Sequence, residues 1–254
     1  MRQPKLLDLD RAMRQPRLLD LFSGAGGAAA GYKRAGFYVV GVDIRPQPRY
    51  CYGGDEFYQC DVFKFWHNLA DYDAIHASPP CQAFTALRTM PNAKPHPDLI
   101  RAVRRMLKAS GRPYVIENVP GAPLRKPGML CGTAFDLGVG AAQLRRHRLF
   151  ETNWPLTCPP CRHDSKRPAI AVTGTGHALA SRPKAATVNV WGHAGGSSTR
   201  SGRQMFSTAE RKEAMGIDWM TGAELSQAIP PSFTEWIGKQ LIARIYLEWE
   251  RRTA

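Results

Sequence analysis

Reactive side chains stand directly after predicted strands in this chain of 254 residues. The clearest is Cys81, in the loop Ser78-Pro-Pro-Cys-Gln-Ala-Phe84, which follows a strand predicted at 73–77. Cysteine is the strongest common nucleophile, and nearby positive charge lowers its pKa and raises the thiolate fraction. A cysteine alone serves packing more often than catalysis, so a second group is needed to decide. We assign the cysteines that lack such a setting to packing: Cys51, Cys60 and Cys131.

A carboxylate occupies the same position after the next predicted strand. Glu117-Asn-Val119 ends the apolar strand predicted at 114–117. In a parallel sheet, groups at the carboxyl ends of neighbouring strands reach one crevice. Glu117 is therefore either a structural hydrogen-bond acceptor or a site residue near the thiol. In a partly apolar crevice a glutamate has a raised pKa and can share a proton with a ring nitrogen.

A glycine-rich turn joins the first predicted strand, 17–22, to a helix predicted at 26–35. Its sequence is Asp20-Leu-Phe-Ser-Gly-Ala-Gly-Gly27, which lets a ligand approach the backbone and the helix N-terminus. Asp43 ends the next predicted strand, where a carboxylate can accept both hydroxyls of a ribose. The pattern satisfies the dinucleotide fingerprint, but nucleotide, flavin and adenosylmethionine sites all use such turns. A tight turn with a surface aspartate is the less favoured alternative.

Short apolar runs alternate with helical stretches from Arg17 onward, which is typical of an α/β sheet. The other predicted elements are a strand at 38–43, a helix start at 61–69, a basic helix at 97–110, a strand at 147–150 and a helix at 207–215. A capping box, Ser232-Phe-Thr-Glu235, predicts the start of the C-terminal helix. We divide the chain into a peripheral segment 1–16, a core 17–150, a loop-rich subdomain 151–205 and a return to the core at 206–254.

The net charge of +14 is concentrated in two blocks. Residues 80–130 and 145–200 each carry nine bases and two acids, whereas the remaining segments nearly balance. Clustered bases are the electrostatic footprint of a polyphosphate partner, because each neutralised phosphate releases condensed counterions. A solvated basic face is the alternative. We expect the helix arginines Arg101, Arg104 and Arg105 mostly to contact phosphates or to brace a closing loop.

Half of a zinc-binding pattern lies in the second basic block. Cys158-Pro-Pro-Cys161-Arg-His163 offers three ligands, and His147, His177 or His193 would have to complete the set. A proline-rich turn with free thiols is the interpretation we prefer, and we assign no metal.

Several classes of protein are excluded. No stretch approaches the ~18–20 apolar residues that span a bilayer, and the N-terminus is too polar for a secretory signal peptide. Six cysteines without an export signal indicate reduced thiols rather than a disulfide scaffold. We therefore expect a cytoplasmic monomer.

Together these motifs resemble those of the cytosine-carbon-5 DNA methyltransferases. The turn from Asp20 to Gly27, Pro80-Cys81-Gln82 and Glu117-Asn-Val119 are similar to the family's first, fourth and sixth motifs, in that order. Three further segments resemble later motifs: Arg146-His-Arg148-Leu-Phe150, Thr208-Ala-Glu-Arg-Lys-Glu-Ala-Met-Gly216 and Gln227-Ala-Ile-Pro230-Pro231. Two features depart from the pattern: Gln143-Leu-Arg-Arg-His-Arg148 holds one extra residue, and Gln227 stands where the family has asparagine.

The resemblance implies a Rossmann-like methyltransferase sheet with helices on both faces, plus a small loop-rich target recognition subdomain. It implies that Cys81 adds to carbon 6 of a flipped cytosine, whose carbon 5 then takes a methyl group from S-adenosylmethionine. Glu117 would hydrogen-bond ring nitrogen 3. Spacing to Phe150 favours Arg146 and Arg148 as the arginines of this site. The implied cofactor-binding residues are Asp20, Phe22, Ser23, Gly24, Gly26, Gly27, Asp43, Ile44, Asp61, Val62, Pro80, Gln227 and Ala228.

Residues 151–205 stand where the family recognises DNA sequence, so the resemblance implies double-stranded DNA as the partner. The expected DNA contacts are Gln82, Arg88, Arg162, Lys166, Arg167, Arg182, Lys184 and Arg200. Three alternatives stay open: a catalytically inactive DNA-binding relative, an RNA cytosine methyltransferase and a nicotinamide-dependent dehydrogenase. The dehydrogenase would leave Pro80-Cys81-Gln82 and the two basic blocks unexplained.

Overall fold

The computed structural model describes residues 14–65, 68–84, 97–171 and 206–253. Its centre is a seven-stranded sheet in the order β3-β2-β1-β4-β5-β9-β6. The strands are β1 (Arg17–Leu21), β2 (Tyr38–Asp43), β3 (Glu56–Gln59), β4 (Ala74–Ala77), β5 (Tyr114–Asn118), β6 (Gly128–Cys131) and β9 (His147–Thr152). Strands β1 to β5 run parallel to one another, and β9 is antiparallel to both β5 and β6.

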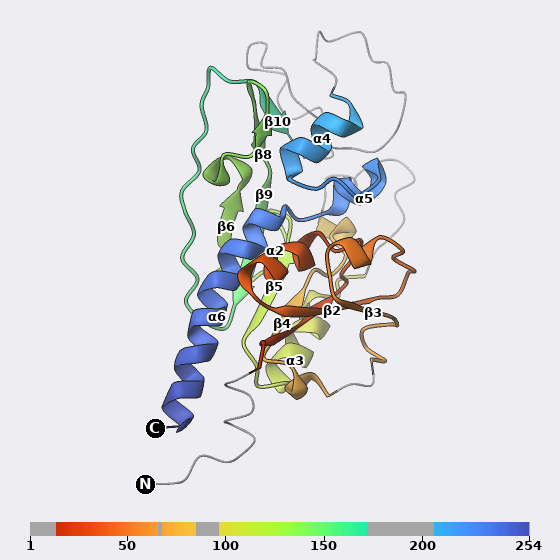
Figure 1. Cartoon of the computed structure of the whole chain (residues 1–254), viewed down its shortest axis with the longest axis vertical. Helices are drawn as coiled ribbons and strands as arrows, with labels where there is room; N and C mark the ends of the chain where they lie inside the picture. Colours follow the sequence, from red (N-terminus) through yellow and green to blue (C-terminus); the bar gives the residue numbers. More distant parts are fainter. Residues whose placement is uncertain (1–13, 66–67, 85–96, 172–205, 254) are drawn as a thin grey trace.

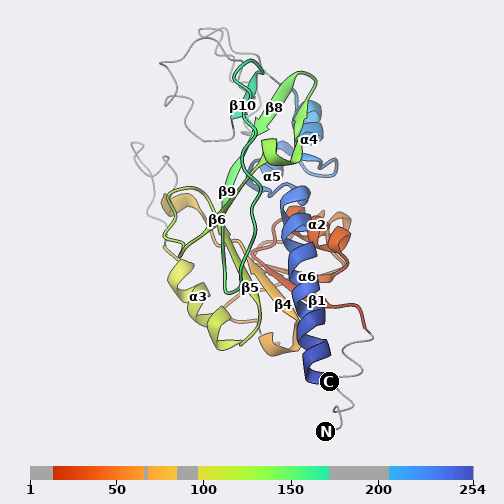
Figure 2. The ribbon, with the colours of Figure 1, turned by 90° about the vertical axis from the view of Figure 1, so that its left-hand side faces the viewer.

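Alternate residues of the central strands supply two separate cores. Leu18 and Val39 face helices α2 (Gly27–Ala35) and α6 (Pro231–Thr253), whereas Leu19 and Val40 face helix α3 (Ile100–Ala109). Figure 2 shows α6 and α3 on opposite sides of the strands. The predicted doubly covered α/β sheet is therefore confirmed.

Helices α2 and α6 pack unusually closely. A Cβ atom built on Gly31 would stand 2.1 Å from the Thr234 hydroxyl oxygen and from the Pro231 carbonyl oxygen. Thr234 donates to the Ala28 carbonyl oxygen at 2.8 Å, which joins the two helices with a buried hydrogen bond. Only glycine fits at position 31, and this contact brings the C-terminal part of the chain back against the glycine-rich turn (Figure 1).

A second, three-stranded sheet lies beyond the end of the main one, in the order β10-β8-β7. Its strands are β7 (Gly138–Val139), β8 (Ala142–Arg145) and β10 (Ala169–Ala171). It packs on helices α4 (Thr208–Met215) and α5 (Gly222–Gln227) through a core that includes Leu144 and Met215. This small sheet therefore takes residues from both sides of the boundary that we expected at 150.

Three local predictions were wrong. The stretch 61–65 forms turns, and the residues that follow at Leu69–Asp71 form a short 3-10 helix, so no long helix starts at 61. Helix α3 begins at Ile100, three residues later than expected, because the Asp98 carboxylate accepts from the Ile100 amide at 2.9 Å. Helix α6 begins at Pro231, which suits the first helical turn, so Ser232 lies inside the helix and does not cap it.

The capping boxes lie elsewhere, at Ser207 with Glu210 and at Thr221 with Glu224. Strand β3 was missed, since its sequence Glu-Phe-Tyr-Gln has only four residues. The expected peripheral character of residues 1–13 falls outside the described residues. Among the described helices, none is long and apolar enough to cross a membrane.

Candidate active site

The strand order reverses between β1 and β4, and this reversal locates the candidate site. From β1 the sheet extends through β2 and β3 on one side and through β4 and β5 on the other. In open parallel sheets, ligands bind beyond the carboxyl ends of the strands at such a switch point. The glycine-rich turn follows β1, the Cys81 loop follows β4, and Glu117 lies near the end of β5.

The glycine-rich turn is held in an unusual backbone conformation. Phe22, Gly24 and Gly26 have positive φ angles of 60°, 50° and 83°. A Cβ atom on Gly24 would meet nothing within 4 Å, so this glycine is required by its φ angle and borders open space. The Asp43 carboxylate fixes the turn by accepting from the Gly24 amide at 3.0 Å, and it accepts from the Arg45 amide at 2.9 Å.

A buried carboxylate without a partner lies beneath this turn. Asp20 is 1% exposed, and neither of its carboxylate oxygens has a hydrogen-bond partner among the described residues. Burial raises the pKa of Asp20 well above its ordinary value, and the charges of Asp43 and Glu117 raise it further. The buried hydroxyls of Ser23 and Tyr50 also lack partners in the described part of the chain. Native proteins rarely leave such groups unpaired, so these atoms fit a polar ligand bound at the turn.

The remaining cofactor-binding residues expected on this side border the same turn. Ile44 follows Asp43 and is 65% exposed, which offers an apolar surface next to the turn. The Cys60 amide donates to the Asp43 carbonyl oxygen at 2.9 Å, which brings Asp61 and Val62 to the same edge. Val62 is buried, and the Asp61 carboxylate accepts from the Phe63 amide at 3.0 Å.

The segment after α5 covers the glycine-rich turn from the other side. A Cβ atom on Gly27 would lie 2.8 Å from the Ile229 carbonyl oxygen and 3.2 Å from the Ala228 Cβ. The Trp219 indole donates to the Ala25 carbonyl oxygen at 2.9 Å. Ala228 is buried in this contact, whereas Gln227 is exposed beside it. The structure therefore brings these expected cofactor residues next to the turn.

The Cys81 loop is fixed from strand β5. The Asn118 side-chain amide donates to the Pro79 carbonyl oxygen at 2.9 Å, and the Phe84 amide donates to the Cys81 carbonyl oxygen at 2.9 Å. Pro80 and Cys81 are half-buried, and Gln82 is exposed. Burial raises the pKa of the Cys81 thiol, with a further rise from Glu117, while the charges of Arg148 and Arg146 act to lower it. Burial and Glu117 thus outweigh the two neighbouring guanidinium groups, which favour ionisation of the thiol.

Glu117 and Arg148 form a buried ion pair beside this thiol. The Arg148 Nε atom lies 2.9 Å from the Glu117 Oε1 atom, and the two side chains are 10% and 8% exposed. Burial raises the pKa of Glu117, whereas the charges of Arg148 and Arg146 and a hydrogen bond from Ser78 lower it. A glutamate whose pKa is raised in this way can share a proton with a bound ring nitrogen. We refer to Cys81, Glu117, Arg146 and Arg148 as the Cys81–Glu117 edge.

The extra residue in the arginine motif is accommodated at the junction of β8 and β9. Arg146 lies between the two strands and is fully buried, and it donates to the Ser226 and Ala228 carbonyl oxygens at 2.9 and 2.6 Å. Arg145 donates instead to the Asp164 carbonyl oxygen at 2.9 Å. Arg146 and Arg148 therefore belong to the Cys81–Glu117 edge and Arg145 does not.

Residues 16–128 match the family model of the C-5 cytosine-specific DNA methylases. This part of the chain is similar to that family. The predicted resemblance is thus confirmed over the segment that holds the glycine-rich turn, Cys81 and Glu117.

One solved structure shows the same fold, and a second one matches part of the chain. The Entamoeba histolytica methyltransferase EhMeth shares 13% identity and covers 91% of this chain and 99% of its own, with a TM-score of 0.53. A DNA modification methyltransferase encoded within an Escherichia coli prophage shares 20% identity over 53% of this chain, with a TM-score of 0.37. The aligned part spans only 45% of that protein's length. No curated protein matches the chain.

A buried hydrogen-bonded chain supports Glu117, and sequence reasoning missed it. The Tyr32 hydroxyl lies 2.9 Å from His76 Nδ1, and His76 Nε2 lies 2.8 Å from the Ser78 hydroxyl. Burial lowers the pKa of His76 to about 3, so the imidazole is neutral. Because Ser78 donates to Glu117, it accepts from His76 Nε2–H, and Nδ1 accepts from Tyr32. His76 at the centre of an apolar strand is the only signal that the sequence offers.

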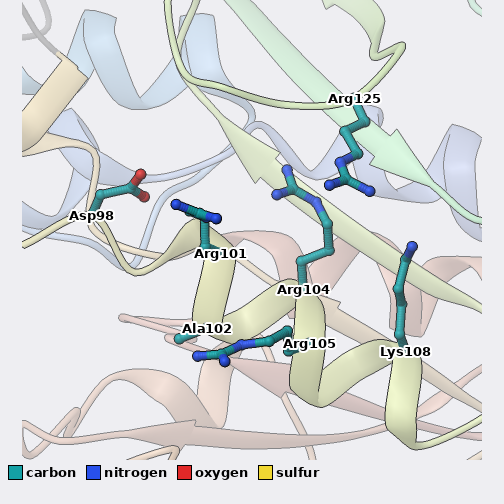
Figure 3. A pocket seen from close by; sticks show the side chains of 7 residues that line it. All are labelled: Asp98, Arg101, Ala102, Arg104, Arg105, Lys108 and Arg125. Carbon is teal, nitrogen blue, oxygen red and sulfur yellow. The ribbon is translucent and has the colours of Figure 1, made fainter.

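The arginines of the basic helix α3 have two different environments. Arg104 is buried and pairs with Glu151 through two contacts of 2.7 Å, so the expectation that it contacts phosphate was wrong. Arg101 and Arg105 are exposed as expected. They line a cavity of about 510 Å³ together with Asp98, Ala102, Arg104, Lys108 and Arg125, as Figure 3 shows. This cavity is a basic surface site rather than part of the Cys81–Glu117 edge.

The expected DNA contacts are described only in part. Arg162, Lys166 and Arg167 are exposed on the loop before β10. Arg167 donates to the Ala141 carbonyl oxygen at 3.1 Å, so its backbone position is fixed against the small sheet. The other expected contacts in the basic blocks fall outside the described residues: Arg88, Arg182, Lys184 and Arg200.

Proposed function

We propose that this protein is a DNA (cytosine-5-)-methyltransferase that acts through a covalent Cys81 adduct. The observation that carries the proposal is a half-buried thiol flanked by a buried Glu117–Arg148 pair, next to a turn with an unpaired buried carboxylate. The similarity of residues 16–128 to the methylase family supports the reaction class. A dehydrogenase would need neither the thiol nor the ion pair.

The donor group at the turn is S-adenosylmethionine, which supplies an electrophilic methyl group on a sulfonium centre when bound. Asp20, Asp43 and Glu117 form a cluster of carboxyl groups at the turn, in which the charges of Asp43 and Glu117 raise the pKa of the buried Asp20. A cationic ligand compensates such a cluster, and the unpaired Asp20 oxygens and Ser23 hydroxyl can accept or donate hydrogen bonds to it. Asp43 and Asp61 would hold the ribose and the adenine, with Ile44 and Phe22 as apolar contacts.

The chemical step follows from the groups at the Cys81–Glu117 edge. Carbon 5 of cytosine is a weak nucleophile, so Cys81 first loses its proton and adds to carbon 6, which breaks aromaticity and makes carbon 5 enamine-like. Glu117 donates a proton or hydrogen bond to ring nitrogen 3 and so stabilises the charge that develops there. Arg148 orients Glu117, and both arginines favour the thiolate. After carbon 5 has been methylated, its proton passes to solvent, and the electron pair left behind breaks the bond between carbon 6 and sulfur, so that Cys81 leaves as a thiolate.

The substrate is a cytosine that has left its stack, because neighbouring bases cover carbon 6 in a duplex. The exposed arginines of α3 provide phosphate contacts, and residues 162–200 provide base contacts. Alanine substitutions at Arg101 and Arg105 should therefore lower the yield of methylation without changing which sites are methylated. The slope of the logarithm of the DNA-binding constant against the logarithm of salt concentration should become shallower by about one unit per lost contact. Substitutions at Arg162 and Lys166 should instead change which cytosines are methylated. Methylome sequencing of both variant sets separates the two roles.

The test of the reaction uses nucleic acid in which 5-fluorocytosine replaces cytosine. Fluorine cannot leave carbon 5 as a proton does, so the wild-type protein with S-adenosylmethionine should form a stable adduct whose protein end maps to Cys81. Cys81→Ser should form none while still binding S-adenosylhomocysteine, and the matched variant Cys51→Ser, at an exposed cysteine, should react like wild type.

Each alternative predicts a different result of this experiment. An inactive DNA-binding relative would retain DNA without an adduct, and an RNA methyltransferase would be trapped only on substituted RNA. An adduct of unchanged yield in Cys81→Ser would show that the nucleophile lies elsewhere.

A further inference from the structure

Two cysteines and two histidines gather at the end of the sheet, away from the Cys81–Glu117 edge. They are Cys131, His147, Cys161 and His163, and their ligand-type atoms all lie within 4.8 Å of one another. The Cys131 Sγ atom is 3.2 Å from His163 Nε2, and the Cys161 Sγ atom is 3.5 Å from His147 Nε2. We refer to these four residues as the Cys/His cluster.

Strand pairing brings the first two members together. Cys131 is the last residue of β6 and His147 the first of β9, and they stand directly opposite each other in the antiparallel register. Directly opposed residues place their side chains on the same face of the sheet with Cβ atoms about 4.5–5.5 Å apart. Half of the cluster is thus fixed by the main sheet itself.

The loop after β9 supplies the other half. Cys161 and His163 are two residues apart, a spacing that puts both side chains on one side of an extended segment. The Arg162 amide between them donates to the Thr133 hydroxyl at 3.2 Å, and the Asp164 amide donates to the Gln143 side chain at 3.1 Å. These bonds hold the loop against the sheet, with both reactive side chains turned toward Cys131 and His147.

The spacing of the four atoms suits a tetrahedral metal ion. Bonds of about 2.3 Å from Zn²⁺ to sulfur and about 2.0–2.1 Å to nitrogen give a tetrahedron with edges of about 3.3–3.8 Å. The sulfur–nitrogen separations of 3.2 and 3.5 Å are close to such edges. The His147 and His163 rings are 5.2 Å apart at 67°, which lets both Nε2 atoms point to one centre.

We propose that Cys131, His147, Cys161 and His163 bind one Zn²⁺ ion as a structural site. Two thiolates and two imidazoles are a ligand set typical of zinc, whereas calcium and magnesium take oxygen ligands. Four protein ligands leave no open position, so the ion stabilises structure and does not activate water. The Thr133 hydroxyl, 3.2 Å from Cys131 Sγ, provides an outer hydrogen bond to the first ligand.

The site ties the loop that leads to β10 to the strand that carries the active-site arginines. His147 lies between Arg146 and Arg148 in sequence, and alternation along the chain sends the two arginines to the Cys81–Glu117 edge and His147 to the cluster. The zinc ion therefore cross-links the start of the expected recognition region to the catalytic sheet.

Cys158 does not belong to the site, although its spacing to Cys161 suggested that it would. A Cβ atom on Gly128 would lie 2.5 Å from the Cys158 Sγ atom, so this thiol packs against β6 backbone. Cys131, which the sequence assigns to packing, is the second cysteine of the cluster in place of Cys158. The pair Cys131→Ser and Cys158→Ser is thus a matched test of the assignment.

The experiment measures metal content in the full chain purified without chelators. Elemental analysis should find about one zinc per chain in wild type and in Cys158→Ser, and zinc should be lost from Cys131→Ser and from His163→Ala. Because Cys131 is buried, its variant could misfold, so the wild-type protein provides the second measurement. Stripping its metal with a strong chelator should lower its melting temperature by several degrees, and adding Zn²⁺ should restore it.

Spectroscopy of the cobalt form tests the ligand set. Co²⁺ added to the stripped wild type and to Cys158→Ser should give the intense visible bands of tetrahedral cobalt with thiolate charge transfer, and Cys131→Ser should not. Three outcomes overturn the proposal: wild type that neither contains nor takes up zinc, equal zinc loss in Cys158→Ser and Cys131→Ser, or a metal-free protein with a Cys131–Cys161 disulfide.

Discussion

The Cys81–Glu117 edge and the Cys/His cluster share strand β9 but are assembled differently. At the edge, the thiol and the carboxylate each stand in a short motif that follows its own parallel strand. In the cluster, two ligands meet only through the pairing of Cys131 with His147 across antiparallel strands, and two come from a loop. Local motifs therefore locate the first region, whereas the second depends on strand register, which a single sequence does not display.

The largest expected effect concerns the anchor that both regions share. Glu151 on β9 forms a buried ion pair with Arg104, and both side chains are at most 8% exposed. Arg104→Ala removes the ion partner of the buried carboxylate and leaves it with the Arg125 amide as donor, at 2.7 Å, which should lower the free energy of unfolding by about 3–5 kcal/mol. Urea denaturation measures this loss. Arg101→Ala and Arg105→Ala, on the exposed side of α3, should stay within about 0.5 kcal/mol of wild type. If all three variants lost the same free energy of unfolding, the distinction between a buried Arg104 and exposed Arg101 and Arg105 would be wrong.

The second prediction separates the two regions by chemistry. Glu117→Gln keeps the shape of the side chain but removes the proton that ring nitrogen 3 requires, so methyl transfer should fall about 10²–10³-fold. The zinc content should not change, because Glu117 takes no part in the cluster. Glu213→Gln, at an exposed position of α4, is the control and should keep normal turnover. Labelled methyl transfer to DNA and elemental analysis of the same samples check both statements.

The sequence predicted most of the Cys81–Glu117 edge because each part of the edge lies in a short local motif. The alternation of β1 and β2, the glycine-rich turn and the prolines before Cys81 all lie within a few residues of the groups that they position. The site predictions that failed concern residues whose partners are distant in the sequence. In the sequence, nothing separates Arg104 from Arg101 and Arg105. Only its ion-pair partner Glu151, on a distant strand, distinguishes it.

The same reasoning applies to Cys131, which the sequence assigns to packing and which we propose as a zinc ligand. Its neighbours in sequence carry no other ligand, so packing was the natural interpretation, and the nearby Cys158 made a better match to a familiar spacing. The partners of Cys131 come from β9 and from the loop after it. The buried Tyr32–His76–Ser78 chain was missed for a similar reason, since its members lie on α2, on β4 and just after β4.

The third prediction concerns the pH dependence of the thiol. Arg148 lowers the pKa of Cys81 against the effect of burial, so Arg148→Gln should raise that pKa further. Only the thiolate is alkylated, so the rate of iodoacetamide labelling at Cys81 should rise with pH in the wild type. The rise should shift to higher pH in the variant, with slower labelling at neutral pH. Peptide mass spectrometry assigns the label to Cys81.

Arg145→Gln is the matched control for this experiment. Its guanidinium contacts the Asp164 carbonyl oxygen and lies outside the edge, so its labelling profile should follow the wild type. A shift in Arg145→Gln equal to that in Arg148→Gln would mean that general charge, rather than the position of Arg148, sets the pKa of Cys81.

The smallest effects are expected from two buried tyrosines that differ in one respect. Tyr32 and Tyr50 are each at most 1% exposed, but the Tyr32 hydroxyl bonds to His76, whereas the Tyr50 hydroxyl has no partner among the described residues. Tyr32→Phe leaves a buried histidine nitrogen unpaired and should cost about 1–2 kcal/mol of unfolding free energy. Tyr50→Phe should stay within about 0.5 kcal/mol, since no hydrogen bond is lost.

Turnover sharpens the difference between the two tyrosines. Loss of the Tyr32 hydroxyl allows His76 to take the other tautomer, which would no longer donate to Ser78, so Glu117 would lose the support of the Ser78 hydroxyl. Tyr32→Phe should therefore lower methyl transfer several-fold at saturating DNA, while Tyr50→Phe retains it or weakens only S-adenosylmethionine binding. Thermal unfolding without ligand and steady-state kinetics distinguish these results. If both variants lost stability and turnover equally, the buried chain would be packing alone, and Glu117 would depend on Arg148 for its orientation.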